Sequence, residues 1–103
     1  MKSEYGVLLV DLIKKKGMTQ ADFCKELGKK KPYFYDFIRE KSNPPPQDVQ
    51  LKIIEILQPK ERDKIKLLNL ASELRNELPA DITKFLLNNK KEYDEIRIRI
   101  CKK

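Results

Sequence analysis

Residues 19–38, TQADFCKELGKKKPYFYDFI, decide the expected fold because they hold two short helical patterns separated by a glycine. Phe23 and Leu27 have the i, i+4 spacing of one face of an amphipathic helix, and Thr19 is a competent N-cap in front of it. Gly28 takes a positive φ at little cost, which suits the position just after a helix. The stretch therefore predicts a first helix that ends at a sharp turn.

A second helix is expected to begin near Lys31. Pro32 fixes φ and has no amide hydrogen, so it is tolerated only in the first turn of a helix. Phe34, Phe37 and Ile38 then form the inward face, at i, i+3 and i+4. The side chains left on or near the outer side are Lys30, Lys31, Tyr35, Asp36 and Arg39. A helix, a tight turn and a second helix with an exposed basic and aromatic side are typical of proteins that enter the DNA major groove.

Further short motifs follow in order along residues 6–57. They are Gly17-Met18-Thr19-Gln20, Phe23-Cys24, Leu27-Gly28, Tyr33-Phe34, Phe37 and Asn43-Pro44. In order and spacing, this segment resembles the Cro/C1-type, lambda-repressor-like helix-turn-helix domain of phage and mobile-element regulators. The resemblance covers about half of the chain and implies an all-α bundle that binds double-stranded DNA.

Two departures from the family pattern affect the expected structure. Lys29 stands where the family usually has a buried valine, and Lys30 lies at the cap, where Ser or Thr is preferred, so we expect weak capping of the second helix. Ile13 and Ile38 stand where many members carry a buried Arg–Glu pair. Exchanging both partners for packed aliphatic side chains can be neutral or stabilising, so the joint change supports the alignment.

The rest of the first 58 residues also has helical patterns. Leu9, Leu12 and Ile13 predict a first helix that closes before Gly17. After a rigid loop at residues 42–46, apolar residues recur every four positions at Val49, Ile53 and Leu57 and predict a fourth helix that ends before Pro59. We therefore expect a helix-turn-helix DNA-binding domain over residues 1–58.

Residues 59–103 are expected to form a C-terminal helical extension that acts as a dimerisation element. A broad apolar stripe follows Pro59, and Pro79 is expected in the first turn of another short helix with Ile82, Phe85 and Leu86. In the tail, Ile96, Ile98 and Ile100 alternate as in a strand, whereas Tyr93, Ile96 and Ile100 fit a helical face. A lone strand has no partner in an all-helical chain, so the helix is favoured.

Composition limits the classes of partner and compartment. The formal net charge is +7 and the pI near 9.4, which favours a polyanionic partner but also serves solubility. Residues 29–41 contain five basic side chains and only two acidic ones. The chain has no histidine, and Cys24 and Cys101 form no metal motif, so no metal or cofactor is expected. With no recognisable signal peptide or apolar span, a reduced cytoplasmic protein that does not touch membrane is expected.

The resemblance assigns candidate DNA-binding roles by position. Lys31, Pro32 and Asp36 match the family's base-edge positions, and Gln20 and Arg39 match its phosphate-contacting positions. Lysine can donate to guanine O6 and N7, and aspartate can accept from cytosine N4. Five further candidates have plain structural alternatives. Lys30 belongs to a turn that could simply be solvated, Tyr33 and Tyr35 could pack their rings or contact phosphate, and Lys41 and Asn43 lie in a loop that could approach the DNA backbone.

Three functional classes are weighed. The favoured one is a sequence-specific transcriptional regulator, a repressor that occludes a promoter as a homodimer on an inverted-repeat operator. The first rival is a protein-binding module of the antitoxin or nuclease-inhibitor type, with its aromatic helix turned toward a protein partner. The second is an enzyme, which is disfavoured because the chain has no histidine, no glycine-rich phosphate loop and no paired-carboxylate motif at a plausible site. The operator, the regulated genes and any regulatory protein partner are not specified by the sequence.

Overall fold

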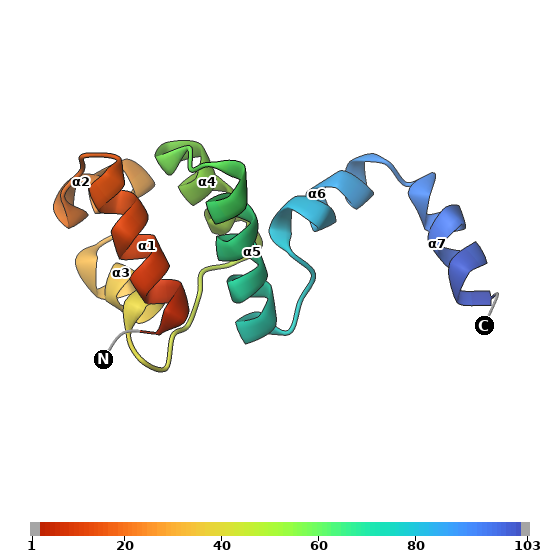
Figure 1. Ribbon diagram of the computed structural model, residues 1–103, viewed down its shortest axis with the longest axis horizontal. Helices are drawn as coiled ribbons and strands as arrows, with labels where there is room; N and C mark the ends of the chain where they lie inside the picture. The colour runs from red at the N-terminus through yellow and green to blue at the C-terminus, as the bar shows by residue number, and fades with distance from the viewer. Residues whose placement is uncertain (1–2, 102–103) are drawn as a thin grey trace.

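In a computed structural model that describes residues 3–101, the chain forms seven α-helices and no β-strand (Figure 1). The helices are α1 (Glu4–Lys15), α2 (Gln20–Leu27), α3 (Lys31–Ile38), α4 (Gln47–Leu57), α5 (Glu61–Arg75), α6 (Ala80–Asn88) and α7 (Glu92–Cys101). This confirms the expected all-α class and the helical alternative for the tail. Residues 1–2 and 102–103, which fall within the two expected domain ranges, lie outside the described residues.

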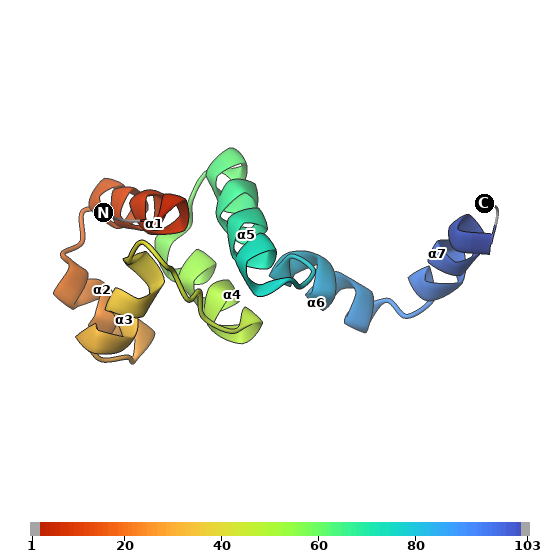
Figure 2. The same cartoon turned by 90° about the horizontal axis from the view of Figure 1, so that it is seen from below.

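The first five helices share one hydrophobic core. α1 contacts α2, α3 and α5, and α2 contacts both α3 and α4. Side chains from all five helices form a single buried cluster: Tyr5, Leu9, Val10, Leu12, Ile13, Phe23, Cys24, Leu27, Phe34, Phe37, Ile38, Val49, Ile53, Leu57, Leu67 and Ala71. Two perpendicular views show these helices gathered at one end of the molecule (Figures 1 and 2). The first helix of the extension, α5, is therefore part of the bundle.

The expected boundaries of α2 are confirmed by its capping contacts. The Thr19 hydroxyl accepts a hydrogen bond from the Asp22 amide at 3.0 Å, and the Asp22 carboxylate accepts one from the Thr19 amide at 3.2 Å. Gly28 has φ 76°, and its amide donates to the Cys24 carbonyl at 2.9 Å. A reciprocal cap at the start and a left-handed glycine at the end fix both the length of α2 and the turn that follows.

The inward face of α3 is the expected one. Phe34, Phe37 and Ile38 are buried, with exposed fractions of 0%, 1% and 7%. The Phe34 ring meets the Phe23 ring of α2 edge-on, with centroids 5.7 Å apart. Edge-to-face aromatic pairs prefer one orientation, so this contact fixes the rotation of α3 about its own axis.

The start of α1 lies directly against the end of α3. The Ser3 amide donates to the Ile38 carbonyl at 3.3 Å, and the Ser3 side chain caps α1 by accepting from the Gly6 amide at 3.0 Å. A Cβ at Gly6 would lie only 2.5 Å from the Ile38 Cα. The absence of a side chain at Gly6 therefore allows the backbones of α1 and α3 to touch.

The loop between α3 and α4 is held by α4 and α5. Gln50 of α4 is buried, and its side-chain amide donates to the Pro45 carbonyl at 2.8 Å. Arg75, at the end of α5, donates to the Pro44 carbonyl at 3.0 Å and pairs with Glu77 at 3.1 Å. These contacts tie the extension to the segment that leaves α3.

The last two helices, α6 and α7, pack progressively less against the bundle. α6 still contacts α4 and α5, but its Ile82 and Phe85 are about half exposed, and α7 buries no residue. Pro79, expected in the first turn of α6, is instead the N-cap residue just before it. The radius of gyration is 15.4 Å, against about 13 Å for a compact domain of this length, so the chain is elongated. Across residues 3–101, no helix combines the length and apolar character needed to cross a bilayer.

The substitution Gly6→Ala should lower the free energy of unfolding by about 1–3 kcal/mol, as is typical of overpacking. A glycine-to-alanine substitution inside a helix usually stabilises a protein, because alanine has the higher helix propensity. A loss of stability at Gly6 would therefore have the opposite sign to the effect of helix propensity. The added methyl group meets backbone atoms of Ile38, which cannot rotate away. Chemical denaturation measures the change, with Val7→Ala on the exposed side of α1 as the control. A stability gain for Gly6→Ala would contradict the close approach of α1 and α3.

The substitution Ile38→Glu should cost about 3 kcal/mol or more, because it places a charge in the core with no arginine opposite. Ile13, the residue at the position of the family's arginine, is itself 1% exposed and apolar. Thermal unfolding measures the effect, and Glu40→Ile, at an exposed site in the following loop, is a control for the same two residue types. Unchanged thermal stability would contradict the burial of this position.

Candidate nucleic-acid interface

The burial of one face of α3 leaves its opposite side open to solvent. Lys31, Pro32 and Arg39 are exposed, Tyr35 is 49% exposed, and Asp36 is half-buried. Except for Pro32, these residues are among the side chains expected to face outward. The helix α3 is eight residues long, or about 12 Å, and Arg39 is the C-cap residue that directly follows it. The exposed side of α3 therefore presents hydrogen-bond donors and acceptors on a rigid support.

The N-terminus of α3 concentrates positive charge without compensation. Lys30 is the N-cap residue, makes no side-chain cap hydrogen bond, and no acidic residue occupies the first turn. The expected weak cap is thus confirmed. Lys29, Lys30 and Lys31 are all exposed around a helix end that already carries partial positive charge. A cation at this end costs about 0.3–1 kcal/mol in a surface helix, so a bound polyanion would relieve the repulsion.

The two tyrosines of α3 differ in their surroundings. Tyr33 is partly buried against the core, with its ring edge-on to Phe37 at a centroid distance of 4.9 Å. The Lys29 ammonium lies 5.1 Å from the centroid of the same ring, within the range of a cation–π contact. The Tyr33 ring therefore takes the packing alternative. Tyr35, by contrast, presents its ring to solvent.

Asp36 and Arg39 form an ion pair along α3. Their charged atoms are 3.5 Å apart, and the side chains are 44% and 62% exposed. An exposed pair of this kind contributes about 0.3–0.5 kcal/mol, so either partner can be drawn away by a stronger contact. The pair also shields the Asp36 carboxylate, which alone would be repelled by phosphate.

The loop after α3 runs back along its last turn. The Asn43 amide donates to the Asp36 carbonyl at 2.8 Å, and the Ser42 hydroxyl donates to the Phe37 carbonyl at 2.5 Å. Lys41 and the Asn43 side chain are exposed. The structure therefore brings the two loop candidates close to the C-terminal half of α3, the helix that carries Asp36 and Arg39.

Gln20 is set apart from the lysines of the turn. It is the first residue of α2, half-buried, whereas the lysines follow the end of this helix. Eight helical residues separate the two ends by about 12 Å. Hydrogen bonds from Thr19 hold the pKa of the neighbouring Asp22 carboxyl below its ordinary value, so this end stays capped at neutral pH.

Sequence reasoning missed one basic residue of this region. The Lys52 ammonium, from α4, lies 4.0 Å from the position that a Cβ would take at Gly28, so it adds a charge beside the turn. In the sequence, Lys52 is one of several polar residues between the apolar positions of its helix, and no local pattern distinguishes it. Only the packing of α4 against α2 places it there.

Metal and thiol chemistry are not evident at this surface. Burial raises the pKa of the Cys24 thiol, and the nearby charge of Lys31 opposes this shift only in part, so the thiol stays protonated at neutral pH. In the part of the chain covered by the structure, no three His, Cys, Asp or Glu side chains are grouped to hold a metal ion.

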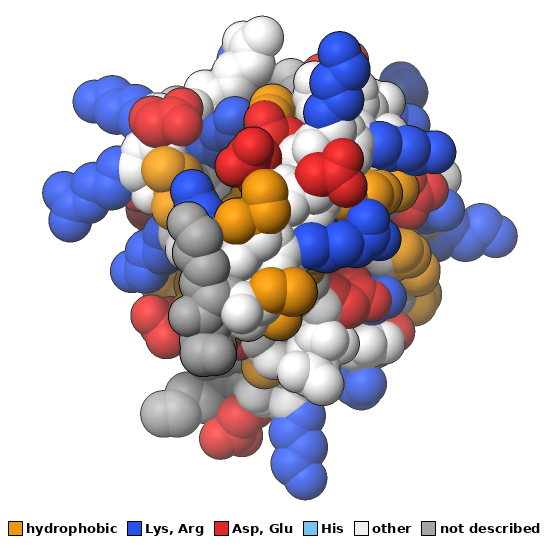
Figure 3. Space-filling model, turned by 90° about the vertical axis from the view of Figure 1, so that its right-hand side faces the viewer, with side chains coloured by type: hydrophobic (Ala, Val, Ile, Leu, Met, Phe, Trp, Pro, Cys, Tyr) orange, Lys and Arg blue, Asp and Glu red, His pale blue; other side chains and the backbone are white. Residues whose placement is uncertain are grey.

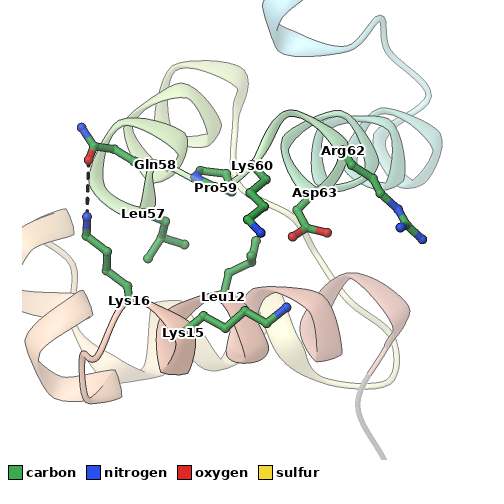
Figure 4. A pocket seen from close by; sticks show the side chains of 9 residues that line it. All are labelled: Leu12, Lys15, Lys16, Leu57, Gln58, Pro59, Lys60, Arg62 and Asp63. Carbon is green, nitrogen blue, oxygen red and sulfur yellow. Dashed lines mark hydrogen bonds between the residues drawn. The ribbon is translucent and has the colours of Figure 1, made fainter.

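A separate surface hollow of about 630 Å³ lies between the end of α1 and the start of α5 (Figure 4). Lys15, Lys16, Lys60, Arg62 and Asp63 line it together with Leu12, Leu57, Gln58 and Pro59. The Lys16 ammonium donates to the Gln58 side-chain oxygen at 3.4 Å, and the Arg62 side chain points away from the hollow (Figure 4). No residue of α3 lines it, so it is distinct from the α3 surface.

The chain has no match among protein-family models, curated proteins or solved structures at a significant level of similarity. A proposed function for this chain therefore rests on the residues and geometry described above.

The substitution Lys30→Ser should raise the free energy of unfolding by about 1 kcal/mol, because serine at an N-cap accepts a hydrogen bond that lysine cannot. The Tyr33 amide, which donates to the Lys30 carbonyl at 3.1 Å, is the expected donor and would share its hydrogen with the serine hydroxyl. Chemical denaturation measures the gain, and Lys41→Ser in the exposed loop removes the same charge without creating a cap. Equal effects of the two substitutions would contradict the account of a poorly capped α3.

Proposed function

We propose that this chain is a sequence-specific double-stranded DNA-binding regulator with a lambda-repressor-like bundle. It would act as a repressor, occluding a promoter as a homodimer on an inverted repeat. The main support is the uncapped, lysine-rich start of α3, on a helix whose other face is buried against α1 and α2. Lys29, Lys30 and Lys31 at the positive end of the helix lower its stability, and a polyanionic partner would restore that stability.

The residues of α3 fit a division between reading bases and holding the backbone. Lys31 lies in the first turn, where it could donate to guanine O6 and N7, and Asp36, five residues on, could accept from cytosine N4. Arg39 and the loop residues Lys41 and Asn43 would approach phosphates beyond the end of the helix. Gln20 would contact the backbone from the start of α2, about one helix length from the turn.

A single recognition helix reads only a few base pairs, so useful specificity calls for two copies on two half-sites. Occlusion of a promoter is the proposed mode of action, because a dimer bound across both half-sites covers that stretch of DNA. Regulation would then come from protein concentration, a protein partner or proteolysis. The reducing cytoplasm is the proposed compartment, in keeping with two free cysteines.

A protein-binding module is the second candidate, supported by the half-exposed ring of Tyr35 on the same side of α3 as the lysines. Exposed tyrosines are frequent anchors of protein interfaces. Salt distinguishes the two candidates, because phosphate contacts release counterions and weaken steeply as salt rises. An interface built around an aromatic anchor would show a much weaker salt dependence.

The substitution Lys31→Ala should weaken binding to a selected operator by about 1–3 kcal/mol and relax base preference at one position, if Lys31 contacts a base edge. Fluorescence anisotropy with operator and scrambled duplexes, at two salt concentrations, measures both effects. Lys84→Ala, in α6, removes the same charge far along the chain and should change operator binding little.

Equal weakening by Lys31→Ala on operator and scrambled DNA would instead assign Lys31 to phosphate contact. If Lys31→Ala and Lys84→Ala had the same small effect, α3 would not be the DNA-reading helix, and the proposed function would be contradicted.

A further inference from the structure

The last helix, α7, stands clear of the rest of the molecule. Tyr93 is half-buried, and every other residue of Glu92–Cys101 is exposed. Figures 1 and 2 show α7 as the element farthest from the bundle, joined to α6 by a short connection. Figure 3, which looks onto this end of the molecule, shows hydrophobic side chains interspersed with acidic and basic ones. A helix of 10 residues is too short to be stable alone in water, so α7 calls for a packing partner.

One side of α7 is apolar. Tyr93, Ile96 and Ile100 are spaced i, i+3 and i+7, which places them within a narrow arc of the helix surface at 3.6 residues per turn. Ile96 and Ile100 are 40% and 62% exposed. Ile98 is 48% exposed and lies on the opposite side. The apolar face of α7 is therefore defined by Tyr93, Ile96 and Ile100.

The charges of α7 are ordered along its length. Glu92, Asp94 and Glu95 occupy the first half, and Arg97 and Arg99 the second. Arg97 and Asp94 pair within the helix at 3.6 Å. Glu92 and Arg99, seven residues apart, lie on one flank of the apolar face, and within residues 3–101 neither has an ion-pair partner. This flank of α7 therefore carries an acidic side chain near the start of the helix and a basic side chain near its end.

We propose that α7 pairs with α7 of a second copy of this chain, in antiparallel orientation about a two-fold axis near Ile96. In this arrangement Ile96 meets its own counterpart, and Tyr93 lies opposite Ile100 of the second copy. Because the same flanks of two antiparallel helices face each other, Glu92 meets Arg99 of the second copy at both ends. In a parallel pair, opposite flanks would face each other, so Glu92 would not meet Arg99 and this match of charges would be lost.

The pairing is expected to be weak in free protein. Two helices of 10 residues contact each other over a length of about 15 Å. The surface area that they bury is therefore far smaller than that of a standard stable interface. The inference deepens the proposed function, because it supplies the homodimer that an inverted repeat requires. On DNA, two copies held on adjacent half-sites would gain from a high effective concentration, so even a weak α7 contact would increase operator occupancy.

Charge reversal tests the pairing in the intact chain without DNA. Glu92→Arg and Arg99→Glu should each weaken self-association roughly tenfold, because each places like charges opposite each other at both ends. An equimolar mixture of the two variants should recover association within about threefold of wild type, since both ends are then matched again. Sedimentation equilibrium measures association, and circular dichroism verifies that each variant keeps its helix content.

Cysteine cross-linking tests the face and the direction. In a Cys101→Ser background, Ile96→Cys should form a disulfide-linked dimer on mild oxidation, whereas Ile98→Cys, on the opposite side, should not. Ile100→Cys should also fail to cross-link, because in antiparallel pairing it lies opposite Tyr93. Cys24 is buried, with 5% exposure, so it does not compete.

Three outcomes would overturn the pairing: a wild-type chain that stays monomeric up to about 1 mM, charge variants that associate as wild type does, or efficient cross-linking through Ile98→Cys. A dimer cross-linked through both Ile96→Cys and Ile100→Cys would show a parallel pair and would contradict the proposed direction. Binding of the charge variants to a single half-site separates this inference from the proposed function. If the charge variants bind a half-site normally but do not dimerise, the DNA-binding proposal still holds. If the chain dimerises but binds no DNA, the α7 pairing holds and the DNA-binding proposal is contradicted.

Discussion

The burial of one face of α3 is the interaction on which the rest of the structure depends. Phe34 and Phe37 are buried in the core that α3 shares with α1 and α2, and the edge-on contact of Phe34 with Phe23 fixes how α3 is rotated. Gly6 lets α1 touch the backbone at the end of the same helix. With the helix held from its inner side and at its end, the outer residues have no freedom to turn inward. The lysines at its start are therefore displayed on a rigid support, as a surface that reads another molecule requires.

The same helix combines a well-packed face with an electrostatically unfavourable end. Its aromatic contacts and buried apolar area stabilise it, while a missing cap and three lysines at the positive end of its dipole oppose it. Local rules of this kind are broken most often where a site serves a function. The helices α4, α5 and α6 also lack a side-chain cap, but each has an acidic residue in its first turn. Among the described helices, α3 alone has none, and this is a physical reason to place the interface on α3.

Much of this arrangement could be predicted from local sequence, because the signals were local. The hydroxyl of Thr19 suits an N-cap, and Gly28 can adopt the left-handed conformation that ends α2. The spacing of Phe34, Phe37 and Ile38 indicates which side of α3 is buried. The contacts that hold α3 in place could not be predicted in this way. Nothing near Gly6 indicates that it faces Ile38, and the bonds from Arg75 to Pro44 and the position of Lys52 beside Gly28 depend on helices that meet far apart in sequence. Hydrophobic spacing likewise identified α6 and α7 as helices but could not show that they would stand away from the core.

The central claim is that α3 reads DNA sequence, and selection from a randomised duplex library tests it most directly. Purified full-length protein would be incubated with the library near physiological salt, and the retained duplexes sequenced. The account predicts enrichment of an inverted repeat whose half-sites are separated by about one helical turn of DNA, with the enrichment lost for Lys31→Ala. If no sequence were enriched and the residual binding vanished with a modest rise in salt, α2 and α3 would be a scaffold for another partner. That result would contradict the account.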